Sequence, residues 1–208
     1  MRAARILVLA GVLVGAALPW PALPWAALPA KAHERSVQPI VGVAVPSLEH
    51  GQMAVYARHW SAIVDLASSH PATRSEDFRR VLNYARIQKA WCLWGLAPRA
   101  IADEDSPFNE CSHAYLAAAR MLLDTMRQGA SFDAPAERLA QTVDRELVYA
   151  GAPVICGFSG EDFDTASHVV PHWADIPRHP PSLIPFAGAA VMMLGAVAAT
   201  RRWLLPPA

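Results

Sequence analysis

Apolar positions recur at helical spacing through the middle of the chain. Between residues 48 and 69 they return every three or four positions, as on one face of an α-helix, with His59 on the same stripe. The segment SSHPATRSE interrupts this pattern, and Thr73 with Glu76 then forms a capping box that opens a second helix. Pro98 ends that helix at about Ala97. The pattern therefore predicts helices over residues 48–69 and 73–97.

Two more helices are predicted from their first residues. Ser106 followed by Pro107 combines a favoured N-cap with a favoured first helical position, and apolar spacing continues from there to Gln128. Asp133 and Pro135 repeat this signature and begin a fourth helix. The predicted fold class is therefore all-α, a small antiparallel bundle of about four helices within residues 33–170.

The regions outside these helices predict little regular structure. The run IVGVAV at residues 40–45 is typical of a short strand, but no partner strand is evident. Prolines are frequent in residues 171–182, which indicates a stiff stalk between the bundle and the C-terminal segment.

The N-terminus has the pattern of an export signal. Arg2 and Arg5 precede an apolar run over residues 6–18, and Ala30-Lys31-Ala32 matches a cleavage site. Residues 1–32 are therefore predicted to be a signal peptide. An uncleaved membrane anchor is the alternative, because a long Pro-broken segment separates the apolar run from the cleavage site.

The C-terminus carries a second apolar run, LIPFAGAAVMMLGAVAAT, without a charge. Arg201, Arg202 and Trp203 follow it directly, as expected for a basic flank with an interfacial Trp. Residues 183–205 are long enough to cross a bilayer, which leaves a short tail at 206–208. The alternative, a buried core helix, would have to be apolar on every side.

The charges agree with an exported middle region. All 18 acidic residues lie between Glu34 and Asp175, whereas five of the 18 basic residues lie outside residues 33–182. The middle region therefore carries 13 basic against 18 acidic side chains, and a net acidic domain is unsuited to binding nucleic acid. Arg outnumbers Lys 16 to 2, a bias typical of GC-rich bacterial genomes. We expect an inner-membrane protein with one C-terminal span and its main domain in the periplasm.

The second predicted helix has two apolar stripes where a surface helix needs one. The second stripe consists of Tyr84, Ile87, Trp91 and Trp94. One interpretation is a central helix buried on both sides; the other is an interaction surface, since exposed aromatic side chains often anchor interfaces.

Three cysteines in an exported chain indicate a disulfide. Cys92 lies five residues before the predicted end of the second helix, and Cys111 lies five residues after Ser106. In an antiparallel hairpin these positions are level, so we predict a Cys92–Cys111 bond, with Cys156 left over.

Candidate chemistry is sparse. His168 and His172 have the spacing of two ligands on one helical turn, and His33 would gain a free amine after cleavage, so these three are the candidate metal ligands. Glu110 and His113 share the polar face of the third predicted helix and are the candidate acid–base pair, although an ordinary solvated face explains them as well. No cofactor is indicated.

These observations favour a non-enzymatic accessory or assembly protein of the bacterial envelope, which binds the membrane and other envelope proteins. Base rates point to a conjugative-transfer or secretion apparatus. A periplasmic metal-handling protein and an envelope enzyme using Glu110 and His113 are the alternatives. The partner and the oligomeric state are left open.

Overall fold

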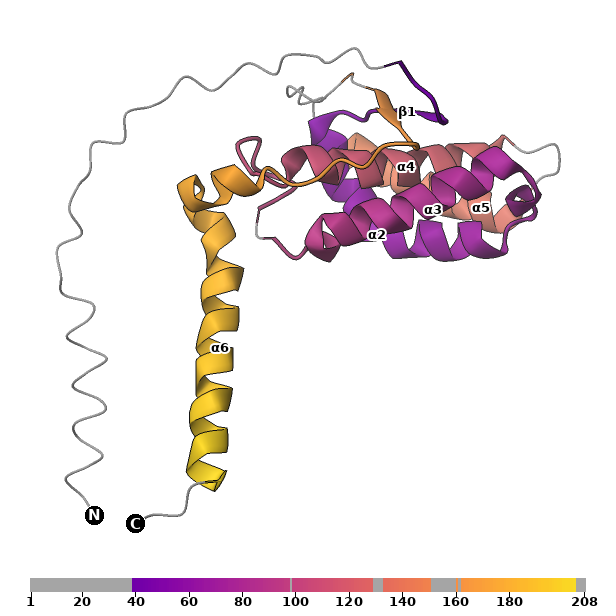
Figure 1. The fold of residues 1–208 in the computed structure, drawn as a ribbon. Helices are drawn as coiled ribbons and strands as arrows, with labels where there is room; N and C mark the ends of the chain where they lie inside the picture. Colours follow the sequence, from indigo (N-terminus) through magenta and orange to yellow (C-terminus); the bar gives the residue numbers. More distant parts are fainter. Residues whose placement is uncertain (1–38, 98, 129–132, 151–159, 161, 205–208) are drawn as a thin grey trace. The chain divides into compact units, whose positions relative to one another are not determined.

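The computed structural model describes residues 39–97, 99–128, 133–150, 160 and 162–204 (Figure 1). The predicted signal peptide, His33, Cys156 and the tail at 206–208 lie outside these residues. The described part is mostly helical, which confirms the all-α prediction. Its bundle helices are α2 (His50–Ser69), α3 (Glu76–Trp91), α4 (Asn109–Arg127) and α5 (Ala134–Tyr149).

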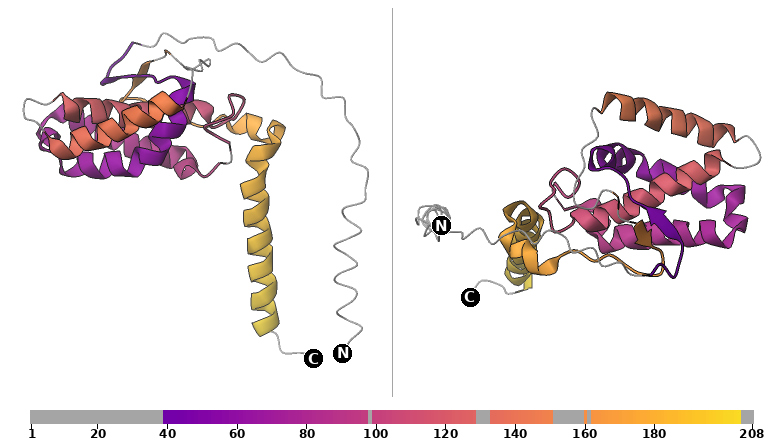
Figure 2. Two further views of the ribbon diagram at one scale, coloured as in Figure 1. Left: turned by 180° about the vertical axis from the view of Figure 1, so that it is seen from behind. Right: turned by 90° about the horizontal axis from the view of Figure 1, so that it is seen from above.

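Helix α4 is the central helix of the bundle. It packs against α2, α3 and α5, and the four helices run side by side in both views of Figure 2. Small side chains at Ala114, Ala117 and Ala118 are buried and let the neighbouring helices approach closely. The double-striped α3 is therefore not the helix that is buried on all sides.

Two predicted helix starts are displaced by a few residues. Thr73 lies in the 3₁₀ helix η1 (Pro71–Arg74), where its hydroxyl donates to the His70 carbonyl at 2.7 Å, and Ser75 is the N-cap of α3. Helix α4 begins after Phe108, because Ser106 accepts the Phe108 N–H within a preceding turn instead of capping the helix.

Helix α3 ends at Trp91, six residues before the predicted end. The next residues form the short 3₁₀ helix η2 (Leu93–Gly95), in which all three backbones have positive φ. Left-handed backbone cannot continue an α-helix, so the chain turns here. By contrast, α5 begins as predicted: the Asp133 carboxylate accepts the Ala136 N–H at 3.4 Å.

The predicted strand near residue 40 has a distant partner. Strand β1 (Ala44–Pro46) pairs antiparallel with β2 (Asp162–Asp164). Before β1, the Asp164 carboxylate accepts the backbone N–H groups of Val41 at 2.7 Å and Gly42 at 2.8 Å. These contacts fasten the start of the domain to the segment that follows α5.

The Pro-rich residues predicted as a stiff stalk lie partly against the bundle. We call residues 165–179 the strap, because they lie along the bundle. The strap includes buried Pro171 and, in the 3₁₀ helix η3 (Trp173–Arg178), buried Ile176. The fully buried amide of Gln88 on α3 bonds both the N–H and the carbonyl of Val169. The prolines therefore stiffen a segment that is already packed on the helices.

The last element is α6 (Pro180–Leu204). Pro180 and Pro181 lie in its first turn, where prolines are tolerated, and Pro185 lies inside the helix. Its stretch Pro180–Arg201 has a mean hydropathy of 1.9 and buries none of its most apolar window in the protein. Helix α6 is therefore long and apolar enough to cross a membrane.

Candidate interaction surface and histidine contacts

The disulfide joins Cys92 to Cys111, the pair predicted from the helical spacing. Cys92 caps the C-terminus of α3 and Cys111 lies in the first turn of α4. Their Cα atoms are 5.8 Å apart, and both residues are buried in the core. The bond therefore fixes the end of α3 against the start of α4.

The predicted aromatic surface is only partly a surface. Tyr84 is buried, whereas Ile87, Trp91 and Trp94 are 44%, 47% and 63% exposed. Trp94 also leaves the stripe, because α3 ends at Trp91 and the backbone turns. The prediction is therefore wrong for Tyr84, which the strap and the core cover.

The strap completes this surface beside α3. The His168 ring lies edge-on to Tyr84 and Trp91, with ring centroids 6.4 Å and 6.3 Å away. Val170, next in the chain to the residue that binds Gln88, is 46% exposed. We call Ile87, Trp91 and Val170 the α3–strap surface. It combines side chains about eighty residues apart in sequence, so periodicity alone could not predict it.

The structure does not bring the predicted metal ligands together. His168 and His172 lie in non-helical backbone, so they do not share a helical turn, because the strap is extended there and contains Pro171. His168 packs between aromatic rings, and His172 binds a carboxylate. Among the described residues, no group of three or more His, Cys, Asp and Glu side chains is arranged to hold a metal ion.

Glu110 and His113 are also separated. Glu110 Oε2 lies 2.7 Å from His172 Nε2 on the strap. This hydrogen bond is the main reason why the pKa of His172 is raised above its usual value. His113 is fully buried instead of facing solvent, so the prediction of a shared polar face is wrong.

Residues 48–50 explain why His113 is buried. They precede and open α2, and the His50 ring lies 5.6 Å from the His113 ring. Burial, followed by the charge of His50, lowers the pKa of His113 to about 4, although a backbone hydrogen bond with Leu48 acts in the opposite direction. His113 is thus a neutral core residue at neutral pH.

A contact that the sequence did not reveal joins the start of α6 to the bundle. His179 Nε2 lies 3.2 Å from Asp103 Oδ2, and His179 Nδ1 lies 2.7 Å from the hydroxyl of Ser182 in α6. The Asn109 side chain at the start of α4 donates to the Asp103 carbonyl at 3.2 Å. In the sequence, His179 is simply a residue before a proline, and no local pattern indicates that it contacts Asp103.

Two more histidines fasten α2 to α5. His59 and Arg58 both contact Glu146, at 2.8 Å and 2.7 Å. His70, at the end of α2, lies 2.9 Å from the N-cap residue Asp133. Imidazole–carboxylate contacts therefore connect distant segments of this domain, which is a structural use of histidine.

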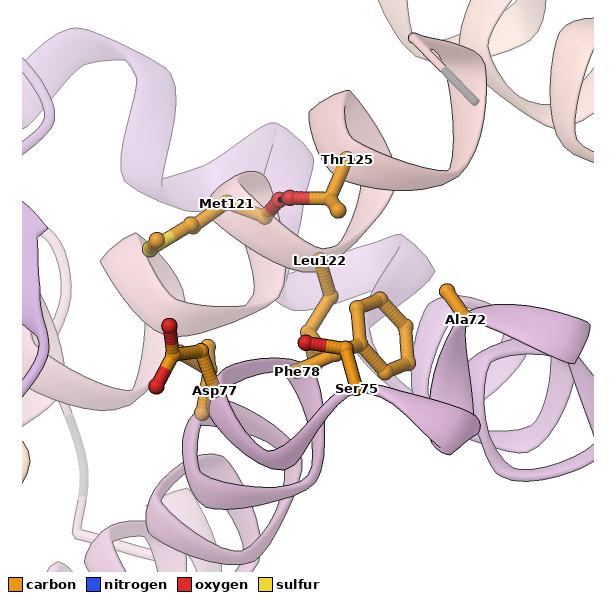
Figure 3. A pocket seen from close by; sticks show the side chains of 8 residues that line it. Ala72, Ser75, Asp77, Phe78, Met121, Leu122 and Thr125 are labelled. Carbon is orange, nitrogen blue, oxygen red and sulfur yellow. Dashed lines mark hydrogen bonds between the residues drawn. The ribbon is translucent and has the colours of Figure 1, made fainter. Parts of the chain in front are cut away.

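A small hollow lies between α3 and α4 (Figure 3). Its volume is about 140 Å³, and its lining includes the apolar side chains of Phe78 and Leu122 and the carboxylate of Asp77. Ligand pockets usually have volumes of about 300–1,000 Å³, so this hollow is too small for a typical cofactor.

No protein-family model, curated protein or solved structure matches this chain. The residues and contacts above are therefore the basis for a functional proposal.

Proposed function

We propose that this protein is a non-enzymatic accessory or assembly protein of the bacterial envelope. Helix α6 would anchor it in the inner membrane, with the helical domain in the periplasm. The length and apolarity of α6 support the anchor, because no side chain in its most apolar window is buried by the protein itself. A helix that is apolar all round needs a nonpolar surrounding, and a bilayer provides one.

The observation that carries the proposal is the α3–strap surface. Ile87, Trp91 and Val170 are each close to half exposed, although large apolar side chains usually go into the core. Aromatic residues set among apolar neighbours are enriched where proteins bind one another, and a few such residues in an interface cost about 2 kcal/mol or more when they are truncated. We infer that this surface binds another envelope protein.

The histidine contacts support binding over catalysis. A catalytic base must lie beside a nucleophile or substrate and be oriented by a third group. Here His172 and His179 hold the strap and the start of α6 through Glu110 and Asp103. These side chains stabilise the position of the anchor relative to the bundle. A conjugative-transfer or secretion apparatus is the kind of assembly we expect the protein to serve.

Affinity capture from detergent-solubilised membranes tests the proposal. The tagged full chain should retain a defined set of proteins, and the double variant Ile87→Ser/Trp91→Ser should lose it. The matched control is Val148→Ser/Tyr149→Ser, which changes two exposed apolar residues at the end of α5. Capture of the same set by all three proteins, or of none by the unchanged chain, would contradict the proposal.

A further inference from the structure

The end of the bundle where α3 stops and α4 starts is tied to the residues just before α6. The His172 N–H donates to the Pro107 carbonyl at 2.9 Å, and the Trp173 ring lies edge-on to Phe108 with centroids 5.9 Å apart. The His179–Asp103 contact adds a third connection. Residues 103–108 therefore cannot lie far from the first turn of α6.

The chain leaves little room between this end of the bundle and a bilayer. Leu183 is the first large apolar side chain of α6 and is exposed. It follows His179 by four residues, or about 6 Å along a helix at 1.5 Å per residue. The headgroup layer on each side of a bilayer is about 5–8 Å thick. If α6 spans the membrane, the Asp103 carboxylate lies at the depth of the lipid headgroups.

Exposed apolar side chains gather in the turns near this end. Trp94 and Leu96, which follow the end of α3, are 63% and 72% exposed, and Trp173 of the strap is 46% exposed. Trp94 has a φ of 56°, a left-handed backbone that is uncommon for a bulky residue. Tryptophan is enriched at the interface between hydrocarbon and water, where its ring is partly buried and its N–H stays hydrated.

We propose that Trp94, Leu96 and Trp173 bind the headgroup region of the same membrane that α6 crosses. This inference rests on the membrane anchoring in the proposed function and adds a second contact with the bilayer. The attraction is apolar, since the exposed neighbours Glu104 and Asp105 would be repelled by anionic lipids. The bilayer would then cover side chains that water otherwise surrounds and would restrict how the bundle turns on its anchor.

Photo-cross-linking of the full chain in phosphatidylcholine nanodiscs tests this contact. p-Benzoylphenylalanine replaces Trp94 or Leu96, both exposed, so the core is not altered. The matched control position is Arg74, which is exposed in η1, next to the N-terminal end of the 16-residue α3. That position is ~24 Å from the Trp91 end. Met193, in the middle of α6, is the reference position for labelling by the lipid of the membrane that α6 would cross.

We expect on the order of tenfold more lipid adduct at positions 94 and 96 than at position 74, because only the first two reach the headgroup layer. Yields at 94 and 96 equal to that at 74, with strong labelling at 193, would overturn the inference and leave the anchor intact. No lipid adduct at 193 would instead refute the anchor itself. In native membranes, an adduct with protein in place of lipid at 94 and 96 would also overturn the inference.

Brominated lipids give a second readout without a photo-reactive residue. They quench tryptophan fluorescence only at close range, so the unchanged chain should lose more emission than the Trp94→Phe variant. Equal quenching of the two proteins would contradict insertion of Trp94.

Discussion

Reduction of the Cys92–Cys111 bond should strongly destabilise the helical domain. The cysteines are 19 positions apart, so the bond closes a loop of 20 residues in the unfolded chain. In the chain-entropy treatment, a loop of this length stabilises the folded state by about 3 kcal/mol. Small domains have unfolding free energies of about 5–15 kcal/mol, so this is a large share of the total.

The assay is urea unfolding of the full chain in detergent micelles, followed by tryptophan fluorescence, with and without a phosphine reductant. Both samples carry Cys156→Ser, which prevents thiol exchange with the third cysteine. With a denaturant slope of about 2 kcal/mol per molar, the midpoint should fall by about 1.5 M on reduction. Coincident unfolding curves would refute the reasoning, because they would show that the bond does not restrict the unfolded chain.

Three further results are expected. His113 should make the unfolding free energy fall by about 2 kcal/mol between pH 7 and pH 5. Burial lowers the pKa of this ring to about 4 from the ordinary 6.5, so in this pH range the unfolded chain binds a proton that the folded protein does not. Urea unfolding of His113→Leu should lack this part of the decrease, and an unchanged decrease would contradict the assignment. Glu110→Gln should lower the pKa of His172 in an NMR titration, because the contact with Glu110 raises that pKa. The stabilising effect of this contact is therefore present at acidic pH and is lost as the pH rises through the pKa of His172 in the folded protein. Gly42→Ala should cost about 1–3 kcal/mol in thermal or urea unfolding, because its Cβ would lie 2.5 Å from the Asp164 carboxylate, and a neutral effect would show that the strand pair can shift.

Local signals predicted the elements whose causes are local. The Asp133 cap of α5 needs only a side chain and a backbone N–H three positions away, and the structure contains it. The apolar run of α6 needs no partner within the chain to become a long apolar helix. The prediction that Cys92 and Cys111 lie level in a hairpin depends on where two helices end and begin. The predicted end of α3 was wrong by six residues and the predicted N-cap of α4 by two, and these errors were small enough to leave the two cysteines within bonding distance.

The wrong predictions for His113 and Tyr84 share one cause, which is that a distant segment covers a helix face. His113 looks polar on an isolated helix, but residues 48–50 and their His50 ring bury it. Tyr84 belongs to an exposed stripe by periodicity, but the strap lies across it and places His168 against its ring. Helical periodicity identifies the side on which a residue lies and not the segment that packs there.

The central claim is that the α3–strap surface of a membrane-held domain binds another envelope protein. Photo-cross-linking in intact cells tests it most directly, with p-benzoylphenylalanine at Trp91 and, as the matched control, at the exposed α5 residue Gln141. We predict one discrete membrane-bound protein adduct from position 91 and none from position 141. No protein adduct from position 91, or the same adducts from both positions, would contradict the claim.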